Sequence, residues 1–214
     1  MSPSLLFVER TPAPAWAVVT ATRPIATLRF GTDPLADRIT RGSGATCDGA
    51  LVRGALQGFE EERSIGSASA PAAAGPGGIV FWDSRAVPSV GAPRPEFGAR
   101  PTVVAIDGRY AGLWLPPGRP VPRSASDLPD GKATDDRPGR AADDGAVPVC
   151  AVDGVWLDAP WDLIEQNRRF LMADLEAFHG LGPDGTPTHH RYDGNPGVWV
   201  ERHHPVWVED DVDI

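Results

Sequence analysis

The sequence feature that most constrains the fold is the run Ile79–Trp82, four consecutive apolar residues followed at once by Asp83. A short run that is apolar at every position predicts a strand covered on both faces, as in the parallel sheets of α/β domains. Asp83 would then lie at the carboxyl end of that strand, where open α/β sheets bind ligands. The run therefore predicts a sheet under helices and makes Asp83 a candidate site residue.

Other apolar runs and turn signals predict the rest of an α/β domain. The dipeptide Asp107-Gly108 separates two of these runs and favours a tight hairpin between them. Further strands are expected at Ser4–Val8, Trp16–Thr20, Thr102–Ile106, Tyr110–Leu115 and Val149–Leu157. Helices are expected at Pro34–Arg41, Ala55–Arg63 and Pro160–His179.

Capping and periodicity predict two details of these helices. Asp33 is expected to cap the first helix, since Pro34 suits the first helical position. Asp158 is the expected cap of the last helix, in which apolar residues recur at helical spacing. Its predicted buried face holds Ile164, Leu171, Leu175 and Phe178, with Asn167 among them.

Long loops are expected because the chain contains 24 glycines and 23 prolines among its 214 residues. Residues 64–78 are rich in Ala, Ser and Gly, and residues 116–148 are rich in Pro, Gly, Asp and Arg. Both segments are predicted to be loose insertions within a domain that spans residues 1–180.

The C-terminal tail carries a different repeat. Val200, Val206 and Val212 recur every six residues, and Val208 and Ile214 do the same. A six-residue apolar period fits neither an α-helix nor a simple hairpin, and it is typical of hexapeptide β-helix coils. Residues 195–214 are therefore predicted to begin a left-handed β-helix.

The charge and the cysteines disfavour several functions and compartments. The chain has 29 acidic and 20 basic residues, and its net charge of −9 disfavours binding to nucleic acid or to an anionic membrane surface. No apolar run approaches the roughly 20 residues of a membrane-spanning helix, and the N-terminus lacks the basic region of a signal peptide. Cys47 and Cys150 form no disulfide framework or metal motif, so a cytoplasmic location is expected.

Three segments, in this order, resemble a known family. They are TRPIATLRFG (Thr22–Gly31), IVFWDSRAVPS (Ile79–Ser89) and PWDLIEQNRRFLMADLEAF (Pro160–Phe178), and the hexapeptide tail follows them. The chain is similar to sugar nucleotidyltransferase-like proteins, relatives of the N-terminal domain of the bifunctional sugar-1-phosphate nucleotidyltransferase/acetyltransferases. The first and third segments are the more specific, and the resemblance spans the chain apart from its two insertions.

The resemblance implies a Rossmann-like nucleotide-diphospho-sugar transferase domain with a C-terminal hexapeptide-repeat stub. Such a domain joins a nucleoside triphosphate to a sugar 1-phosphate, which yields a nucleotide sugar and pyrophosphate. Because the reaction brings two anions together, it needs Mg²⁺ and fixed cationic or N–H donors near the phosphates. Mg²⁺ is therefore the implied cofactor.

The resemblance also implies a metal site. Family members place one metal-binding Asp after a central strand and another polar ligand near the end of the domain. The matching residues here are Asp83 and Asp162, and Asn167 is the alternative second ligand. A structural role stays open for Asp162, since a carboxylate in the first turn of a helix is stabilised by the helix dipole alone.

Phosphate and substrate contacts are implied for the first segment. Arg23 and Arg29 would steady the phosphates as the catalytic cations, and Thr22 would contact the substrate together with Asn167. A structural alternative is open here as well, because Arg23 is also able to pair with the acidic cluster Glu60–Glu62.

The chain departs from active family members in ways that favour a second hypothesis. It lacks their Gly-rich G-x-G-T-R-M loop, and its single lysine, Lys132, lies in a predicted insertion. The alternative function is a catalytically degenerate module for ligand sensing, or for assembly with its own copies or with a hexapeptide-repeat protein. A third hypothesis is that the chain is the front part of a longer bifunctional enzyme.

Overall fold

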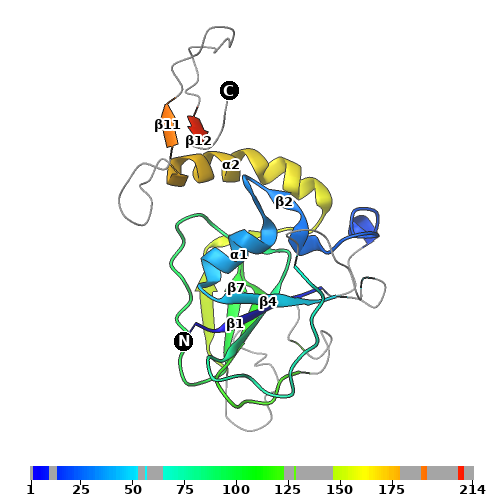
Figure 1. The fold of residues 1–214 in the computed structure, drawn as a ribbon, viewed down its shortest axis with the longest axis vertical. Coiled ribbons are helices and arrows are strands. Elements are labelled where there is room, and N and C mark those ends of the chain that lie inside the picture. Colours follow the sequence, from blue (N-terminus) through cyan, green and yellow to red (C-terminus); the bar gives the residue numbers. More distant parts are fainter. Residues whose placement is uncertain are drawn as a thin grey trace.

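The described part of the chain is built around one large sheet (Figure 1). The computed structural model describes residues 2–9, 14–52, 56, 65–122, 128, 147–178, 189–191 and 207–209. The sheet has six strands in the order β4-β1-β5-β8-β7-β9. Their bounds are β1 Ser4–Val8, β4 Thr46–Leu51, β5 Ile79–Asp83, β7 Thr102–Ile106, β8 Arg109–Leu115 and β9 Val149–Val152.

Smaller elements complete the described part. Three antiparallel pairs are β2 (Arg29–Phe30) with β3 (Asp33–Pro34), β6 (Ala86–Pro88) with β10 (Gly154–Trp156), and β11 (His189–Arg191) with β12 (Trp207–Glu209). The helices are the 3-10 turns η1 (Pro14–Trp16) and η2 (Ile25–Thr27) and the α-helices α1 (Leu35–Ser43) and α2 (Pro160–Phe178). Figure 1 shows α1 next to the sheet and α2 beyond it. None of these described helices is long and apolar enough to cross a membrane.

β1 is the strand from which the chain connections lead to both sides of the sheet. It pairs in parallel with β4 on one side and with β5 on the other. Because the chain passes from β1 to β4 and then to the opposite side for β5, the connections diverge at β1, which makes this a topological switch point. Beyond β5, β8 runs antiparallel between β5 and β7, and β9 is parallel to β7. The sheet is therefore mixed.

The buried strand predicted from the apolar run is confirmed as β5. All of its residues, Ile79–Asp83, are buried. Val80 and Trp82 belong to the larger hydrophobic core, on one face of the strand. Ile79 and Phe81 belong to a smaller core, on the other face. Each fully buried side chain of this size contributes about 1.5–3 kcal/mol of hydrophobic stabilisation, so β5 anchors both cores.

The predicted hairpin is confirmed as well. β7 and β8 are antiparallel and are joined by Asp107 and Gly108. These two residues have positive φ angles of 52° and 68°, as a type I′ turn requires. The dipeptide Asp107-Gly108 therefore sets the register next to the turn, and the register shifts between Val104 and Ala105.

The predicted strand Trp16–Thr20 is wrong, because η1 and a turn occupy these residues. In a strand, Trp16, Val18 and Thr20 would share one face. Trp16 and Thr20 are buried, but the Val18 side chain is 85% exposed. The amide and the hydroxyl of Thr20 donate to the Trp16 carbonyl at 3.0 and 2.7 Å. This local hydrogen bonding competes with strand formation and wins here.

The predicted strand Val149–Leu157 is divided in two at Asp153. β9, before Asp153, joins the large sheet next to β7. β10, after it, pairs with β6 in a separate two-stranded sheet. The division brings β10 next to the residues that follow β5, which belong to the candidate site.

The helix predicted near Pro34 is confirmed as α1, but its predicted cap is wrong. Pro34 is the N-cap residue, and no side chain caps the helix. Asp33 pairs with Phe30 in the β2–β3 hairpin, and its carboxylate forms an ion pair with Arg41. The tight turn between β2 and β3 therefore takes the place of the predicted cap.

The helix predicted from Pro160 is confirmed as α2, but its buried face differs. Ile164 is 79% exposed, which contradicts its predicted place in the core. Phe170 and Asp174 are buried instead. Leu163 and Asn167 are half-buried on the same face. Asn167 lies on the predicted face, but the hydropathy pattern missed Asp174 because this side chain is polar. Both side chains bind the loop before α1.

Part of the predicted insertion at 64–78 is held against the sheet. The Ala50 amide donates to the Gly66 carbonyl at 3.1 Å, and the Ala68 amide donates to the Ala50 carbonyl at 2.8 Å. Residues 66–68 therefore follow the edge of β4, whereas Ala73 forms an antiparallel bridge with Pro120. Residues 65–78 form no helix.

Several predictions fall outside the described residues. These are the helix at 55–63 apart from Leu56, most of the insertion at 116–148, most of the β-helix start at 195–214, and the side chains of Leu175 and Phe178. β11 and β12, which are described, pair antiparallel. The coils of a β-helix stack in parallel, so this pair adds no support to the β-helix prediction.

The structure predicts unequal effects of truncating Trp16 and Val18. Trp16→Ala removes a fully buried side chain and is expected to lower the free energy of unfolding by about 3–5 kcal/mol. Val18→Ala changes an exposed side chain and is expected to alter it by less than about 0.5 kcal/mol. Urea unfolding of both variants measures the difference, and similar losses in the two would instead support a strand with both side chains on its buried face.

Candidate functional site

Two buried carboxylates lie at the carboxyl ends of the adjacent parallel strands β1 and β5. Val8, the last residue of β1, pairs with Asp83, the last residue of β5. Glu9 follows Val8 directly, and both Glu9 and Asp83 are buried. This edge coincides with the switch point at β1, the place where open α/β sheets bind ligands.

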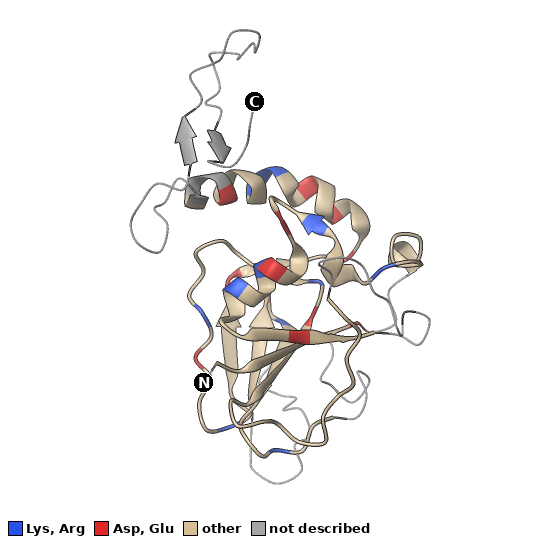
Figure 2. Cartoon of the chain, viewed as in Figure 1, with Lys and Arg blue, Asp and Glu red and all other residues tan. Residues whose placement is uncertain are grey.

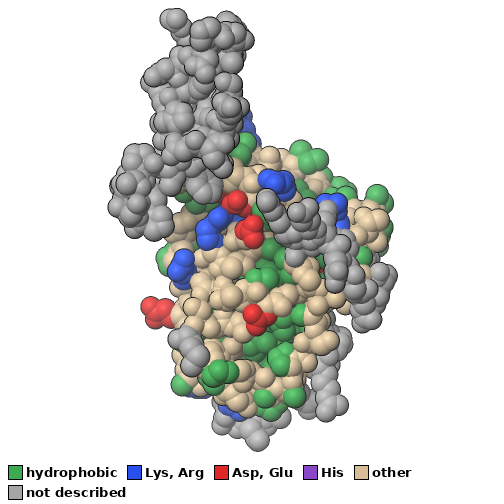
Figure 3. All heavy atoms as spheres, viewed as in Figure 1, with side chains coloured by type: hydrophobic (Ala, Val, Ile, Leu, Met, Phe, Trp, Pro, Cys, Tyr) green, Lys and Arg blue, Asp and Glu red, His purple; other side chains and the backbone are tan. Residues whose placement is uncertain are grey.

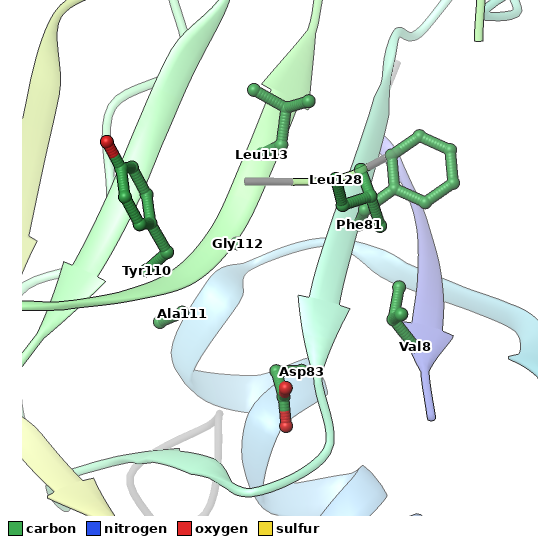
Figure 4. A pocket seen from close by; sticks show the side chains of 8 residues that line it. All are labelled: Val8, Phe81, Asp83, Tyr110, Ala111, Gly112, Leu113 and Leu128. Atoms are coloured by element: carbon green, nitrogen blue, oxygen red, sulfur yellow. The ribbon is translucent and has the colours of Figure 1, made fainter. Parts of the chain in front are cut away.

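A pocket opens at the same edge (Figure 4). Its empty volume is about 260 Å³, which includes space open to solvent. Figure 4 shows Asp83 at the end of β5 and Val8 on the neighbouring β1, with the Tyr110 side chain on β8. Most of the lining is apolar, and the remaining lining residues are Phe81, Ala111, Gly112, Leu113 and Leu128. The pocket therefore offers one carboxylate at the margin of an apolar wall.

Asp83 is held by Arg85, two residues further along the chain. The Arg85 amide and Nε donate to Asp83 Oδ1 at 3.0 and 3.1 Å, and Arg85 Nη2 donates to Oδ2 at 3.0 Å. Both carboxylate oxygens therefore accept hydrogen bonds from one guanidinium. This two-point pairing is the strong form of an arginine–carboxylate contact, and it offsets the charge of Asp83.

Arg85 belongs to a second group of charges around Trp156. Its guanidinium lies 5.3 Å from the Trp156 ring centroid, and that of Arg109 lies 4.2 Å from it. Arg109 Nη1 donates to Asp158 Oδ1 at 2.7 Å. Both arginines thus pair with a carboxylate and lie against the same aromatic ring, a favourable cation–π arrangement. This group connects the end of β5 to the start of α2.

Asp162 caps the helix in which it lies. Its Oδ2 accepts hydrogen bonds from the amides of Asp158 and Ala159 at 2.7 and 2.8 Å. A carboxylate in the first turn that reaches back to the preceding amides is the acidic half of a capping box. The structure therefore gives this predicted metal ligand a structural role.

Asn167 contacts the first of the three segments that carry the family resemblance. Its Oδ1 accepts a hydrogen bond from the Gly31 amide at 2.8 Å. Asp174, two turns further along α2, accepts hydrogen bonds from the amide and hydroxyl of Thr32 at 3.0 and 3.2 Å. The polar face of α2 thus binds the turn between β2 and β3.

Arg38 of α1 completes this arrangement. Its Nε and Nη2 donate to the Phe30 carbonyl at 3.2 and 2.9 Å, and Nη2 also forms an ion pair with Asp174. Arg38 and Asp174 are only 3% and 2% exposed. The Arg38 guanidinium also lies 5.8 and 5.1 Å from the ring centroids of Phe30 and Phe170. Residues Gly31, Thr32, Arg38, Asn167 and Asp174 are called the clasp below.

The clasp lowers the pKa of Asp174. Burial by itself would raise the pKa of this carboxyl group, because it disfavours the charged form. Hydrogen bonds from Arg38 and Thr32, together with the Arg38 charge, outweigh burial and leave the pKa below its ordinary value. Asp174 is therefore ionised at neutral pH, and its pairing with Arg38 depends on that charge.

The predicted phosphate-contacting residues lie on the surface. Thr22, Arg23 and Arg29 are all exposed. Arg29 Nη1 donates to the Thr32 carbonyl at 3.1 Å. The segment that carries them is tied to the end of β1, since the Ile25 amide donates to the Glu9 carboxylate. The structure thus anchors this segment beside the switch point at one end and in the clasp at the other.

Sequence reasoning missed several residues of the site. Glu9 follows an apolar strand just as Asp83 does, so the same signal was available for it. Asp174 follows Asn167 by seven residues, which places both on one face of a helix. Arg38 and Arg85 carried no comparable signal, because their roles depend on partners that only the fold brings to them.

The fit of Mg²⁺ to this edge depends on Asp83. Within the described ranges, no group of three or more His, Cys, Asp or Glu residues is arranged to hold a metal ion. Mg²⁺ often needs only one or two carboxylates, with phosphates and water completing its shell. Asp83 has the position for such a ligand, but a metal would have to displace Arg85 from it.

The chain matches no protein-family model, and no curated protein matches it either. The interpretation of the site therefore depends on its geometry and on the resemblance of the three segments.

Two glycines provide a matched test of the clasp. Gly31 and Gly91 both have positive φ, at 70° and 76°, so a side chain at either strains the backbone by about 1 kcal/mol. A Cβ at Gly31 would overlap Asp174 and Arg38, whereas one at Gly91 would meet nothing within 4 Å. Gly31→Ala is therefore expected to lower the melting temperature well beyond Gly91→Ala, and equal shifts would contradict a packed clasp.

The lowered pKa of Asp174 predicts a pH dependence. A group with a depressed folded-state pKa stabilises the fold above its unfolded pKa, and this contribution is lost as pH falls through the folded pKa. Asp174→Asn leaves the Arg38 charge buried without its partner and is expected to cost about 3 kcal/mol near pH 7. The difference from the unsubstituted protein should shrink below about pH 4 in urea titrations. A difference that stays constant with pH would contradict the ion pair.

Proposed function

We propose that the chain is a sugar-1-phosphate nucleotidyltransferase-like domain, which binds a nucleoside triphosphate and a sugar 1-phosphate at the carboxyl edge between β1 and β5. The observation that carries this proposal is the switch point at β1, with Asp83 buried at the end of β5 and a pocket beside it. Sheets of this kind bind ligands at that place. The products would be a nucleotide sugar and pyrophosphate.

The chemistry requires that anionic reactants be neutralised and held in line. Mg²⁺ bound at Asp83 would supply charge for the triphosphate. Arg85, once released from Asp83, would present a planar guanidinium to phosphate oxygens beside the pocket. Arg23 and Arg29 belong to a segment anchored next to this edge, and their exposed side chains suit contacts with phosphates. Thr22 and Asn167 remain proposed substrate contacts, although Asn167 would have to leave Gly31.

A second candidate function is a module that binds the same ligands, or assembles with its own copies or with a hexapeptide-repeat protein, without catalysing transfer. One specific observation favours it: the oxygens of Asp162 and Asn167 already accept backbone hydrogen bonds, which explains these residues without catalysis. The lack of a Gly-rich loop and of a lysine before Lys132 points the same way.

We also propose a cytoplasmic location, on the basis of the cysteines. Cys47 and Cys150 are free thiols that are half-buried.

Burial raises the pKa of Cys47, as do the nearby charges of Asp48 and Asp37, although a backbone hydrogen bond from Gly49 opposes this. The protonated thiol is a poor nucleophile, so Cys47 needs no catalytic role.

Ligand-dependent thermal stability tests the proposal. Nucleoside triphosphates and nucleotide sugars, each with and without Mg²⁺, are added at about 100 times their dissociation constant, which stabilises a folded protein by roughly 2.7 kcal/mol. Asp83→Asn is expected to abolish the Mg²⁺-dependent shift. Asp158→Asn is the matched control, because it also removes the acidic partner of an arginine on Trp156, and it should keep the shift.

The outcomes separate the two candidate functions. A Mg²⁺-dependent shift together with pyrophosphate release from a triphosphate and a sugar 1-phosphate supports the transferase. A shift without pyrophosphate release supports the binding module. The absence of a shift with every nucleotide contradicts nucleotide binding and therefore the transferase.

A further inference from the structure

The outer face of α2 carries an apolar stripe that is largely exposed in the described part of the chain. Trp161, Ile164 and Met172 are 56%, 79% and 51% exposed. Their spacing of three and eight residues places them on one side of the helix, away from the buried Phe170 and Asp174. Single exposed apolar residues are ordinary, but three along one helix face form a patch of the kind that marks interaction sites.

Two opposite charges lie within this stripe. Glu165 and Arg168 fall between Ile164 and Met172 on the same side of α2, and both are exposed. Neither has a hydrogen bond or an ion pair to any described residue. Figure 2 shows both acidic and basic positions along α2, and Figure 3 shows apolar and basic side chains together at the end of the molecule where α2 lies. The stripe thus combines apolar ends with an acid and a base at its centre.

We propose that a second copy of this chain covers the stripe, through antiparallel pairing of the two α2 helices about a two-fold axis between Gln166 and Asn167. Residues equally distant from that axis then meet. Trp161 packs against the partner subunit's Met172, and Glu165 pairs with the partner subunit's Arg168. Because of the symmetry, each of these contacts occurs twice.

The argument for a second copy is the self-complementarity of the stripe. A two-fold interface places one surface against itself, so each acidic position must face a basic position of the same stripe. Glu165 and Arg168 meet this condition, since each lies one and a half residues from the proposed axis. Trp161 and Met172 meet it for the apolar ends, at five and a half residues. Trp, Met and Arg are also residue types enriched at protein interfaces.

The expected dimer is weak. α2 has 19 residues and is about 28 Å long, so two such helices alone bury less than the roughly 1,200 Å² of a standard stable interface. We therefore expect association at micromolar concentrations or above. The proposal does not depend on the proposed function, because the pocket and Asp83 lie on other elements.

Sedimentation velocity tests the pairing with charge exchanges. It is measured over about 1–300 µM, a range that spans the dissociation constants expected for a small interface. Glu165→Arg and Arg168→Glu each place like charges opposite one another, twice per dimer. Each single variant is expected to raise the dimer dissociation constant at least about tenfold. The double variant E165R/R168E restores opposite charges in reversed positions and is expected to recover the dimer. Arg100→Glu changes an exposed arginine outside α2 and serves as the control, with no expected effect.

The double variant distinguishes pairing from unfolding, because two destabilising changes would not restore association. Thermal unfolding of each variant checks that the fold is intact. A monomer at every concentration overturns the proposal, whether another protein or the chain's own C-terminal residues then cover the stripe. A dimer that none of the charge exchanges alters overturns it as well, since that dimer would use a different surface.

Discussion

The arrangement of α1, α2 and the β2–β3 turn depends on the buried ion pair of Arg38 and Asp174. The two residues are 136 positions apart, so only the folded chain brings them together. Each charge would be costly to bury alone, and burying the pair forfeits much of the hydration of both. The pair therefore adds less net stability than its attraction implies. Its main effect is to make the packing of α2 specific, because α2 can bury Asp174 only next to Arg38.

The clasp joins two of the segments on which the predicted family resemblance depends. Gly31 ends the first segment of the family resemblance, and Asn167 and Asp174 belong to the third. These residues bind one another directly, through the Gly31 amide and the Thr32 amide and hydroxyl. A resemblance that depends on both segments therefore reflects, at least in these positions, a structural contact. The catalytic part of the resemblance depends on Asp83 and on the edge of the sheet.

The sequence predicted the elements that a local signal marks. These are β5 from its apolar run, the hairpin from Asp107-Gly108, and the extents of α1 and α2 from helical spacing and their initial prolines. The errors occurred where polar partners decide burial. Ile164 was assigned to the core because it is apolar, yet the inward face of α2 holds Asp174 beside the predicted Asn167. The same limit applies to the site, since Asp83 was predicted from the strand before it, but its pairing with Arg85 was not.

The charges at the edge of the sheet are already paired with one another. Asp83 pairs with Arg85, and Asp158 with Arg109, while both arginines lie against Trp156. A polyanion approaching this edge would meet these pairs, within a chain whose net charge is −9. Under the proposed function, a metal ion would replace Arg85 at the Asp83 carboxylate, and a phosphate oxygen would replace that carboxylate as an acceptor for Arg85. Metal and phosphate should therefore reinforce each other's binding at this edge, because each takes over a contact that the binding of the other breaks.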